Sequence, residues 1–169
     1  MMICAEMRLH LGVAGKLACP QYYDPYTMVD NLSSVERSRL MARVKHEDTQ
    51  PELIVRRILH RMGYRFRLHR RDLPGKPDIV LPKLKAAVFV NGCFWHGHKN
   101  CRLGRLPKSN VPFWQAKISA NIKRDRTVAT QLREHGWNVK VVWACQAANL
   151  GRLESMLQKF LRTQSGDMN

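Results

Sequence analysis

The stretch Pro77-Asp78-Ile79-Val80-Leu81, followed by the run Ala86-Ala87-Val88-Phe89-Val90, decides the fold. Both are short apolar runs rich in β-branched residues and separated by turn-forming residues, a pattern typical of buried strands. Just upstream, residues 64–68 alternate apolar side chains, Leu68 among them, with arginines. This alternation predicts a half-exposed strand with a basic outer face. Three consecutive strands are therefore expected here.

Helical patterns flank these strands. Residues 49–52, Thr-Gln-Pro-Glu, form a capping box with Pro in the first turn, and the apolar spacing that follows predicts a helix over about 50–62. A long helix is expected over about 110–136, a fourth strand over 137–143, and a final amphipathic helix with its apolar residues over 150–161. The order helix, three strands, helix, strand, helix predicts an α/β domain with a mixed sheet flanked by helices.

The size and charge of the chain limit its function. With 169 residues the chain suffices for one domain, which we expect over residues 28–165, while residues 1–27 are expected to be an extension with little order. Lys and Arg number 29 against 13 Asp and Glu, so the formal net charge is +16. A field of this sign attracts phosphate polyanions, which makes nucleic acid the first partner to consider.

The sequence argues against a membrane partner. No apolar run approaches the roughly 20 residues of a spanning helix. The apolar stretch over 9–19 is short and interrupted by Lys16, so it is not expected to act as a signal peptide. The expected location is the cytoplasm.

The segment Gly92-Cys93-Phe94-Trp95-His96-Gly97-His98-Lys99-Asn100-Cys101 follows the third predicted strand. Cys93, His98 and Cys101 have the close spacing of a zinc knuckle. The five cysteines of the chain are an odd number, which argues against a closed disulfide framework and favours a reduced protein with a metal site. The two adjacent aromatics lie in a loop that should not bury them, so they are expected to contact something outside the chain.

A Pro-Asp pair at the start of a strand matches the core of the restriction-endonuclease-like (PD-(D/E)xK-type) nucleases, in which this Asp holds a catalytic divalent metal. The usual Glu/Asp-x-Lys of the next strand is absent, because the corresponding end reads Phe89-Val90-Asn91. Residues 89–98, FVNGCFWHGH, resemble the very-short-patch-repair (Vsr) endonucleases, which replace Glu-x-Lys with other groups. The resemblance runs from about residue 28 to 160 and includes RSRLM at 37–41, LPGKPD at 73–78, Phe113-Trp114, Gly136-Trp137 and VVWAC at 141–145.

This resemblance implies a Mg-dependent endonuclease that nicks one strand of duplex DNA 5′ of the thymine in a T:G mismatch, the product of 5-methylcytosine deamination. The expected partner is double-stranded DNA with that mismatch, with mismatch-repair proteins as further candidates, and the enzyme is expected to act as a monomer. Two alternatives stay open. One is a nickase or nuclease of the same fold with another target, and the other is a zinc-stabilised DNA-binding module without catalysis.

The resemblance also implies roles for individual residues. Asp78 corresponds to the metal-binding carboxylate of the family, and the backbone carbonyl of Val90 to a second metal contact. His96 corresponds to the catalytic histidine that accepts a proton from the attacking water. Glu52 matches an acidic residue of the family but also fits the capping box. Asn91 replaces a second histidine of some members, and Asn cannot transfer a proton at neutral pH.

The distant zinc ligand of the family corresponds to Cys145. The resemblance therefore implies a closed, structural tetrahedral site formed by Cys93, His98, Cys101 and Cys145. The alternatives are free buried thiols and, for His96, a place as a zinc ligand.

The family wedges aromatic side chains into the base stack beside the mismatch, and Phe94 and Trp95 match them. Such a wedge costs a few kcal/mol of unstacking, less at a mispaired step. Met41 matches a companion wedge from the opposite groove. The alternative for the two aromatics is packing on the zinc loop.

The predicted long helix carries polar residues on its inward side. We expect Lys117, Asn121, Arg124 and Asp125 to form a network that braces the site or reaches DNA phosphates, the first three as DNA contacts. A purely structural ion-pair network is the alternative.

Overall fold

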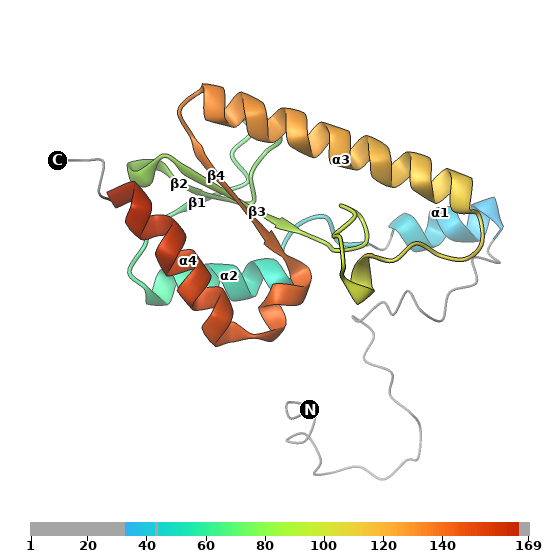
Figure 1. Ribbon diagram of the computed structural model, residues 1–169, viewed down its shortest axis with the longest axis horizontal. Coiled ribbons are helices and arrows are strands. Elements are labelled where there is room, and N and C mark those ends of the chain that lie inside the picture. The colour runs from blue at the N-terminus through green and yellow to red at the C-terminus, as the bar shows by residue number, and fades with distance from the viewer. Residues whose placement is uncertain (1–32, 43, 166–169) are drawn as a thin grey trace, which may run out of the picture.

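The computed structural model describes residues 33–42 and 44–165 (Figure 1). The predicted extension, residues 1–27, lies outside this described part. The helices are α1 (Ser34–Ala42), α2 (Gln50–Arg61), α3 (Val111–Glu134) and α4 (Leu150–Ser165). The strands are β1 (Arg67–Leu68), β2 (Ile79–Leu81), β3 (Ala86–Asn91) and β4 (Asn138–Trp143). Short 3₁₀ turns occur at Pro82–Leu84, Arg102–Gly104 and Ala144–Ala148.

The four strands form one mixed sheet in the order β1-β2-β3-β4. The first three pair antiparallel, whereas β3 and β4 pair parallel, from Ala86 opposite Asn138 to Asn91 opposite Trp143. One face of the sheet is covered by α3 and the other by α2 and α4 (Figure 1). The predicted mixed sheet with flanking helices is confirmed. Because β3 and β4 run parallel, the segments that follow them meet at the same end of the sheet.

The main core lies between the sheet and the pair α2 and α4. In β3, Ala86 and Val88 point into this core, as the period of two in a strand requires. Helix α2 begins at the predicted capping box, and α4 contributes three buried leucines at four-residue spacing. These residues are Leu153, Leu157 and Leu161.

Two local predictions differ from the structure. Leu68 is 41% exposed instead of facing the core, because β1 is a two-residue edge strand and the chain turns away at His69, whose φ is 46°. Helix α1 was not predicted, since its residues show no clear apolar stripe. A capping pair starts it: the Ser33 Oγ accepts from the Glu36 N–H at 3.3 Å, and the Glu36 carboxylate accepts from the Ser33 N–H at 2.9 Å.

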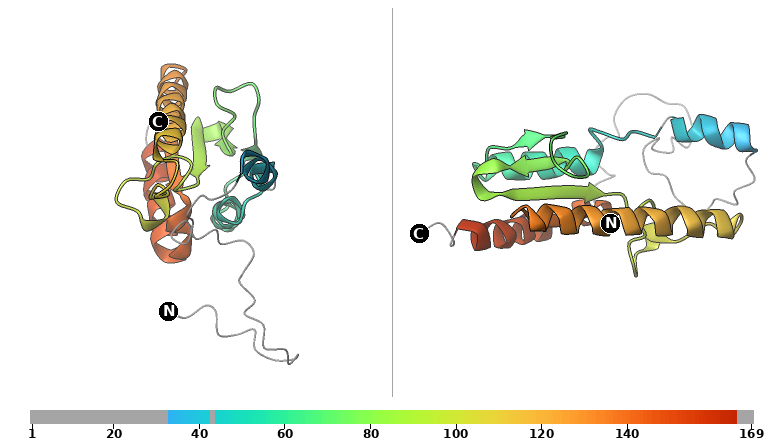
Figure 2. Two further views of the ribbon diagram at one scale, coloured as in Figure 1. Left: turned by 90° about the vertical axis from the view of Figure 1, so that its right-hand side faces the viewer. Right: turned by 90° about the horizontal axis from the view of Figure 1, so that it is seen from above.

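Helix α1 lies past the end of the sheet, at the same end as the first half of α3 (Figures 1 and 2). None of the described helices combines the length and apolar character that a membrane span requires.

The loop before β2 packs tightly on α3. Gly75 has φ 69°, and a Cβ placed there would lie 2.3 Å from Cγ1 of Val128. Gly63 also has a positive φ, 82°, but a Cβ there would meet no atom within 4 Å.

We expect Gly75→Ala to lower the free energy of unfolding by about 2–4 kcal/mol, because it adds overpacking against Val128 to the cost of a left-handed residue. Gly63→Ala is the matched control and should lose only about 1–2 kcal/mol. Adding Val128→Ala to Gly75→Ala should recover part of the loss. Urea unfolding measures all three, and equal losses for the two glycine variants would refute the close docking of this loop.

Candidate active site and metal centre

A cavity of about 390 Å³ opens between the sheet, the loop before β2 and α3. Its wall includes polar residues from four different segments, among them His69, Asp78, Asn91, His96 and Asp125. Three of the residues proposed from sequence for catalysis, Asp78, Asn91 and His96, are thus brought to one cavity. Asn91 is the last residue of β3 and is only 8% exposed.

Asp78 precedes β2 and is held by the neighbouring strand. Its Oδ2 accepts the backbone N–H of Val90 at 2.7 Å. Because the N–H and C=O of a strand residue point to the same side, the Val90 carbonyl is also directed toward Asp78. Burial raises the pKa of Asp78 to about 6, an effect opposed by the Val90 N–H and reinforced by the charge of Glu52. Asp78 lines the cavity, and the Val90 carbonyl is the strand oxygen directed to its side.

His96 is paired with Asp125 of α3. The His96 Nδ1 lies 2.5 Å from Oδ2 of Asp125, and Arg124 donates to the other Asp125 oxygen at 3.3 Å. An ionised carboxylate only accepts hydrogen bonds, so the ring hydrogen of His96 lies on Nδ1 and its Nε2 is left as a basic nitrogen. Sequence reasoning placed Asp125 in a network but did not identify it as the partner of His96.

Glu52 is only 3% exposed and holds the start of α2. One oxygen accepts from the N–H and hydroxyl of Thr49, at 3.4 and 2.7 Å. The other accepts from the Asp48 N–H at 3.0 Å and from Arg56 at 2.9 Å. A carboxylate has about four acceptor sites, so all of them are in use. The capping role expected for Glu52 is confirmed.

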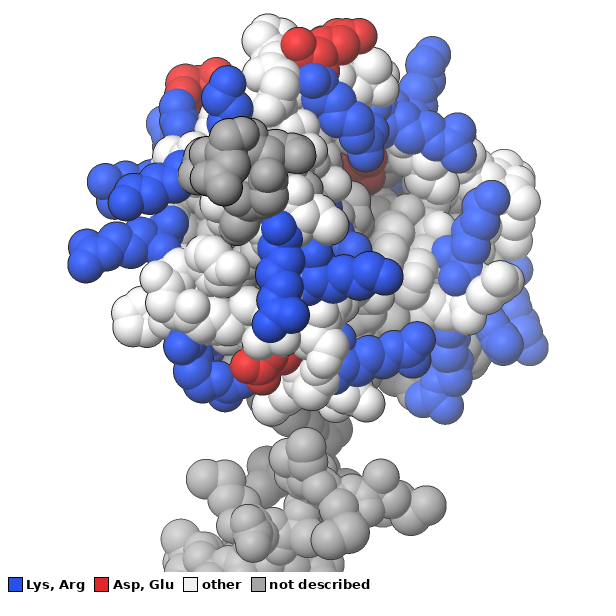
Figure 3. Space-filling view, turned by 60° about the vertical axis from the view of Figure 1, so that its left-hand side comes forward, with Lys and Arg blue, Asp and Glu red and all other residues white. Residues whose placement is uncertain are grey.

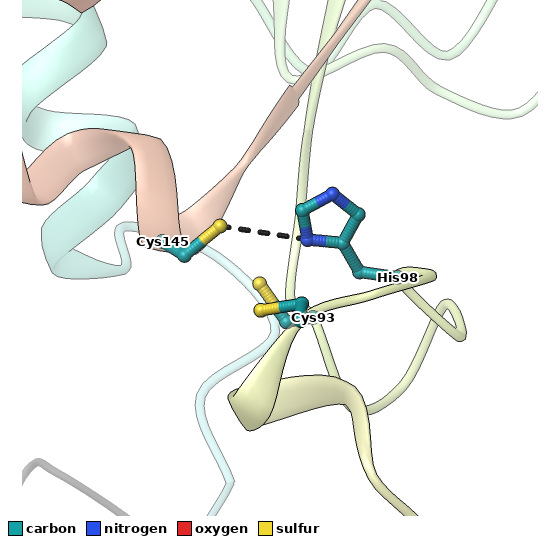
Figure 4. Close-up of side chains that lie close together, drawn as sticks. Cys93, His98 and Cys145 are labelled. Atoms are coloured by element: carbon teal, nitrogen blue, oxygen red, sulfur yellow. Dashed lines mark hydrogen bonds between the residues drawn. The ribbon is translucent and has the colours of Figure 1, made fainter.

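The residues proposed as zinc ligands converge. Ligand atoms of Cys93, His98, Cys101 and Cys145 all lie within 4.8 Å of one another. In Figure 4 the Cys145 sulfur, at the turn after β4, points at the His98 ring of the loop, with Sγ 3.4 Å from Nδ1. Trp143 stacks on the face of the His98 ring, with the two ring centroids 4.2 Å apart. His96 lies outside this cluster, with Asp125.

The chemistry of this cluster fits a metal. Burial raises the pKa of Cys93 to about 12 and also raises the pKa of Cys145, so without a cation these thiols stay protonated. A bound cation reverses this preference by stabilising thiolates. Tetrahedral zinc with Zn–S bonds of about 2.3 Å places its sulfurs about 3.8 Å apart, a spacing compatible with the observed cluster.

The aromatic residues of the loop form a cluster with α3. Phe94 is 6% exposed and packs edge-on against two tryptophans. Its ring centroid lies 4.9 Å from that of Trp95 and 5.1 Å from that of Trp114. The prediction that the loop buries neither aromatic is wrong for Phe94, because the first turns of α3 cover it. Trp95 is half-buried and lies 6.0 Å from Trp114. Phe113 stays 47% exposed beside this cluster.

Trp114 was missed as a site residue, although the Phe113-Trp114 pair in the sequence is a signal that could have identified it. The missing information was spatial, because Trp114 is 19 residues from Trp95 along the chain. Met41 lies in α1, and its side chain is outside the described part of the structure.

The predicted polar network on α3 forms only in part. Asn121 donates to the backbone carbonyl of Trp95 at 2.9 Å, and Arg124 joins Asp125. Lys117 is exposed and has no hydrogen-bond or ion-pair partner among the described residues, so it does not belong to the network. Its place one turn before Asn121 directs it to solvent near the aromatic cluster.

The surface carries the excess positive charge of the sequence. Figure 3 shows Lys and Arg side chains spread over one face, with far fewer carboxylates among them.

Comparison with known proteins supports a nuclease. Residues 29–102 match the family model described as DNA mismatch endonuclease Vsr. The chain is 52% identical over 134 residues to Type II nicking enzyme V.XorIIP of Xanthomonas oryzae pv. oryzae (strain KACC10331 / KXO85), covering 79% of this chain and 98% of that protein. It is 37% identical over 118 residues to the DNA mismatch endonuclease Vsr of Escherichia coli (strain K12), covering 70% of this chain and 75% of that protein.

Among solved structures, the catalytic domain of the homing endonuclease I-Bth0305I has a similar fold. The TM-score is 0.50 at 21% identity, over 69% of this chain and 98% of that domain. The fold is thus similar to that of this homing-endonuclease catalytic domain. The sequence relatives narrow the class: the chain belongs to the Vsr family and is an endonuclease.

The raised pKa of Asp78 predicts a stability change. Its folded pKa of about 6 exceeds the unfolded value near 4, so the ionised carboxyl destabilises the fold above pH 6, and this cost fades as the pH falls toward 4. Without added metal, Asp78→Asn should therefore raise the free energy of unfolding by about 2–3 kcal/mol at pH 7.5.

Urea unfolding at several pH values measures this gain, which should shrink progressively between pH 6 and pH 4. Asp72→Asn is the matched control, because Asp72 is exposed and its pKa is lowered by Arg70. A gain from Asp78→Asn that does not depend on pH would contradict the buried, raised carboxyl.

Proposed function

We propose that this protein is a Mg-dependent endonuclease that nicks one strand of duplex DNA 5′ of the thymine in a T:G mismatch. The observation that carries the proposal is the shared cavity, in which the His96–Asp125 pair and the Asp78 carboxylate face the same space. A proton acceptor and a cation-binding oxygen are the two groups that phosphodiester hydrolysis requires.

Magnesium is the proposed catalytic metal, held by the Asp78 carboxylate and the Val90 carbonyl. Both are hard oxygen ligands, which Mg²⁺ prefers. The raised pKa of Asp78 supports this choice, because a buried carboxylate without a fixed cationic partner gains most from a divalent ion. When bound, the metal lowers the pKa of a water molecule and stabilises the charge that develops on the phosphate.

His96 is the proposed proton acceptor. Asp125 keeps the hydrogen on Nδ1 and orients the ring, so that Nε2 is the nitrogen able to take a proton. Asn91, with an amide that donates but does not titrate, is proposed to hydrogen-bond the phosphate. Glu52 is proposed to act on Asp78 through its charge and not as a direct metal ligand, because its four acceptor sites are already engaged at the start of α2.

A structural zinc ion is proposed at the four converging ligands. With all four positions taken by protein, such a site leaves no place for a reacting water. The ion would tie the loop after β3 to the turn after β4, and so fix both His96 and the aromatic cluster.

The aromatic cluster is the proposed DNA wedge. Half-buried Trp95 is the more accessible of the two rings, and buried Phe94 packs against both Trp95 and Trp114, so the rings together form the apolar edge proposed to enter a weakened base step. Met41 is proposed to enter from the other groove. Contacts to the DNA backbone are proposed for Lys117, Asn121 and Arg124.

The substrate assignment predicts a specific cleavage pattern. With Mg²⁺, the protein should nick the thymine strand of a T:G duplex at least about 10-fold faster than the matched T:A duplex, since a mispaired step is easier to unstack. His96→Ala should lower the single-turnover rate by roughly 100-fold or more and leave DNA binding unchanged.

Equal nicking of matched and mismatched duplexes would instead favour a nickase with another target, in line with relatives named as Type II nicking enzymes. Binding of duplex without nicking under any of these conditions would favour the non-catalytic DNA-binding module.

The zinc proposal predicts one zinc ion per chain, measured by native mass spectrometry of purified protein. Cys101→Ala should lose the ion and lower the melting temperature, because three ligands hold zinc less tightly and the loop loses its anchor. Cys19→Ser is the matched control and should keep both. Zinc-free wild-type protein with an unchanged melting temperature after chelation would refute the site.

A further inference from the structure

Arg56 and His69 make a contact that the proposed reaction does not use. Arg56 comes from α2, and its side chain is 12% exposed. One guanidinium nitrogen donates to Asp48 at 2.5 Å and the other to Glu52 at 2.9 Å. The second nitrogen also lies 3.1 Å from Nε2 of His69. The guanidinium is therefore fixed by two carboxylates beside the imidazole.

This contact determines where the His69 ring carries its hydrogen. A guanidinium has N–H donors and no acceptor, so the His69 Nε2 must be the acceptor of the 3.1 Å contact. The single ring hydrogen then lies on Nδ1. That nitrogen has no hydrogen-bond partner among the described residues, although His69 lines the cavity that holds Asp78 and His96.

The backbone also fixes His69. Its φ of 46° is in the left-handed region, which costs a residue with a side chain about 1–2 kcal/mol. Its N–H donates to the carbonyl of Asp78 at 3.4 Å. His69 is therefore anchored by its backbone to Asp78 and by Nε2 to Arg56, and its Nδ1–H is left without a partner among the described residues.

We propose that His69 donates this Nδ1–H to a non-bridging oxygen of the scissile phosphate, and that Arg56 is a positioning residue that keeps the hydrogen on Nδ1. The proposal rests on the nicking function proposed above. An anionic oxygen next to Asp78 needs donors, and a neutral donor that is already fixed stabilises the charge that develops there without reorganising. Lys76 and Arg124 also line this cavity, each paired with a carboxylate, Glu47 and Asp125 respectively.

Two substitutions separate this role from a structural one. In His69→Asn the amide nitrogen can take the place of Nδ1, whereas in His69→Gln the amide reaches the position of Nε2 and can keep the Arg56 contact. We expect the Gln variant to nick T:G DNA roughly 100-fold more slowly than wild type in single turnover at saturating DNA. The Asn variant should stay within about 10-fold of wild type, and the dissociation constant for DNA should change little in either.

A purely structural role predicts the opposite order, because only Gln preserves the bond to Arg56. Equal rates for the two variants, or a faster Gln variant, would overturn the proposal. The wild-type nicking rate in the same assay tests the proposed function separately, since the inference concerns only the order of the variants.

A second measurement needs neither magnesium nor DNA. Nitrogen-15 NMR of the histidine rings should show the His69 hydrogen on Nδ1 in wild type, and Arg56→Met should reduce this preference. Arg57→Met is the matched control, because Arg57 is exposed on the same helix and should leave the signal unchanged. A wild-type ring protonated on Nε2 would refute the assignment even if the enzyme nicks DNA.

Discussion

The parallel pairing of β3 with β4 is the constraint on which the rest of the structure depends. Parallel neighbours cannot be joined by a tight turn, so the chain must cross back over the sheet. Here the crossover occupies residues 92–137 and holds most of the site. Helix α3 has 24 residues, about 36 Å, whereas a six-residue strand spans about 20 Å. Its first half therefore extends past the sheet and covers the loop after β3, which brings Trp114 to Phe94, and Asp125, just past the middle of the helix, meets His96.

On the β2 side of the cavity, the ionisation of the buried Asp78 carboxyl depends on a balance between burial and the charges around it. Burial raises the pKa of Asp78, the nearby charge of Glu52 adds to this rise, and the Val90 N–H and Arg56 offset part of it. A cationic partner for Asp78 would make the fold more stable but would weaken the attraction of a metal ion, because a carboxylate that is already neutralised binds a further cation less strongly. Arg56 instead pairs with Glu52 and Asp48, and the hydrogen-bond donor to the Asp78 carboxylate is the backbone N–H of Val90.

The sequence predicted the elements whose signals are local. The capping box at Thr49–Glu52, the apolar runs of β2 and β3 and the amphipathic α4 all follow from neighbouring residues, and the structure confirms them. Helix α1 and the exposed Leu68 were not predicted. Helix α1 starts at its capping pair and shows no clear apolar stripe, and Leu68 is exposed because the edge strand β1 ends at a left-handed residue.

For the site, the sequence by itself determined the residue types: a Pro-Asp before a strand, a loop with two cysteines and two histidines, and a family resemblance that the relatives bear out. Only the tertiary structure decided which residues meet. Phe94 is buried, Lys117 stands apart, His96 pairs with Asp125, and Arg56 reaches His69. The physical reason is distance along the chain. Arg56 and His69 are 13 residues apart and His96 and Asp125 are 29 residues apart, and only the packing of α2 and the crossover bring these partners together.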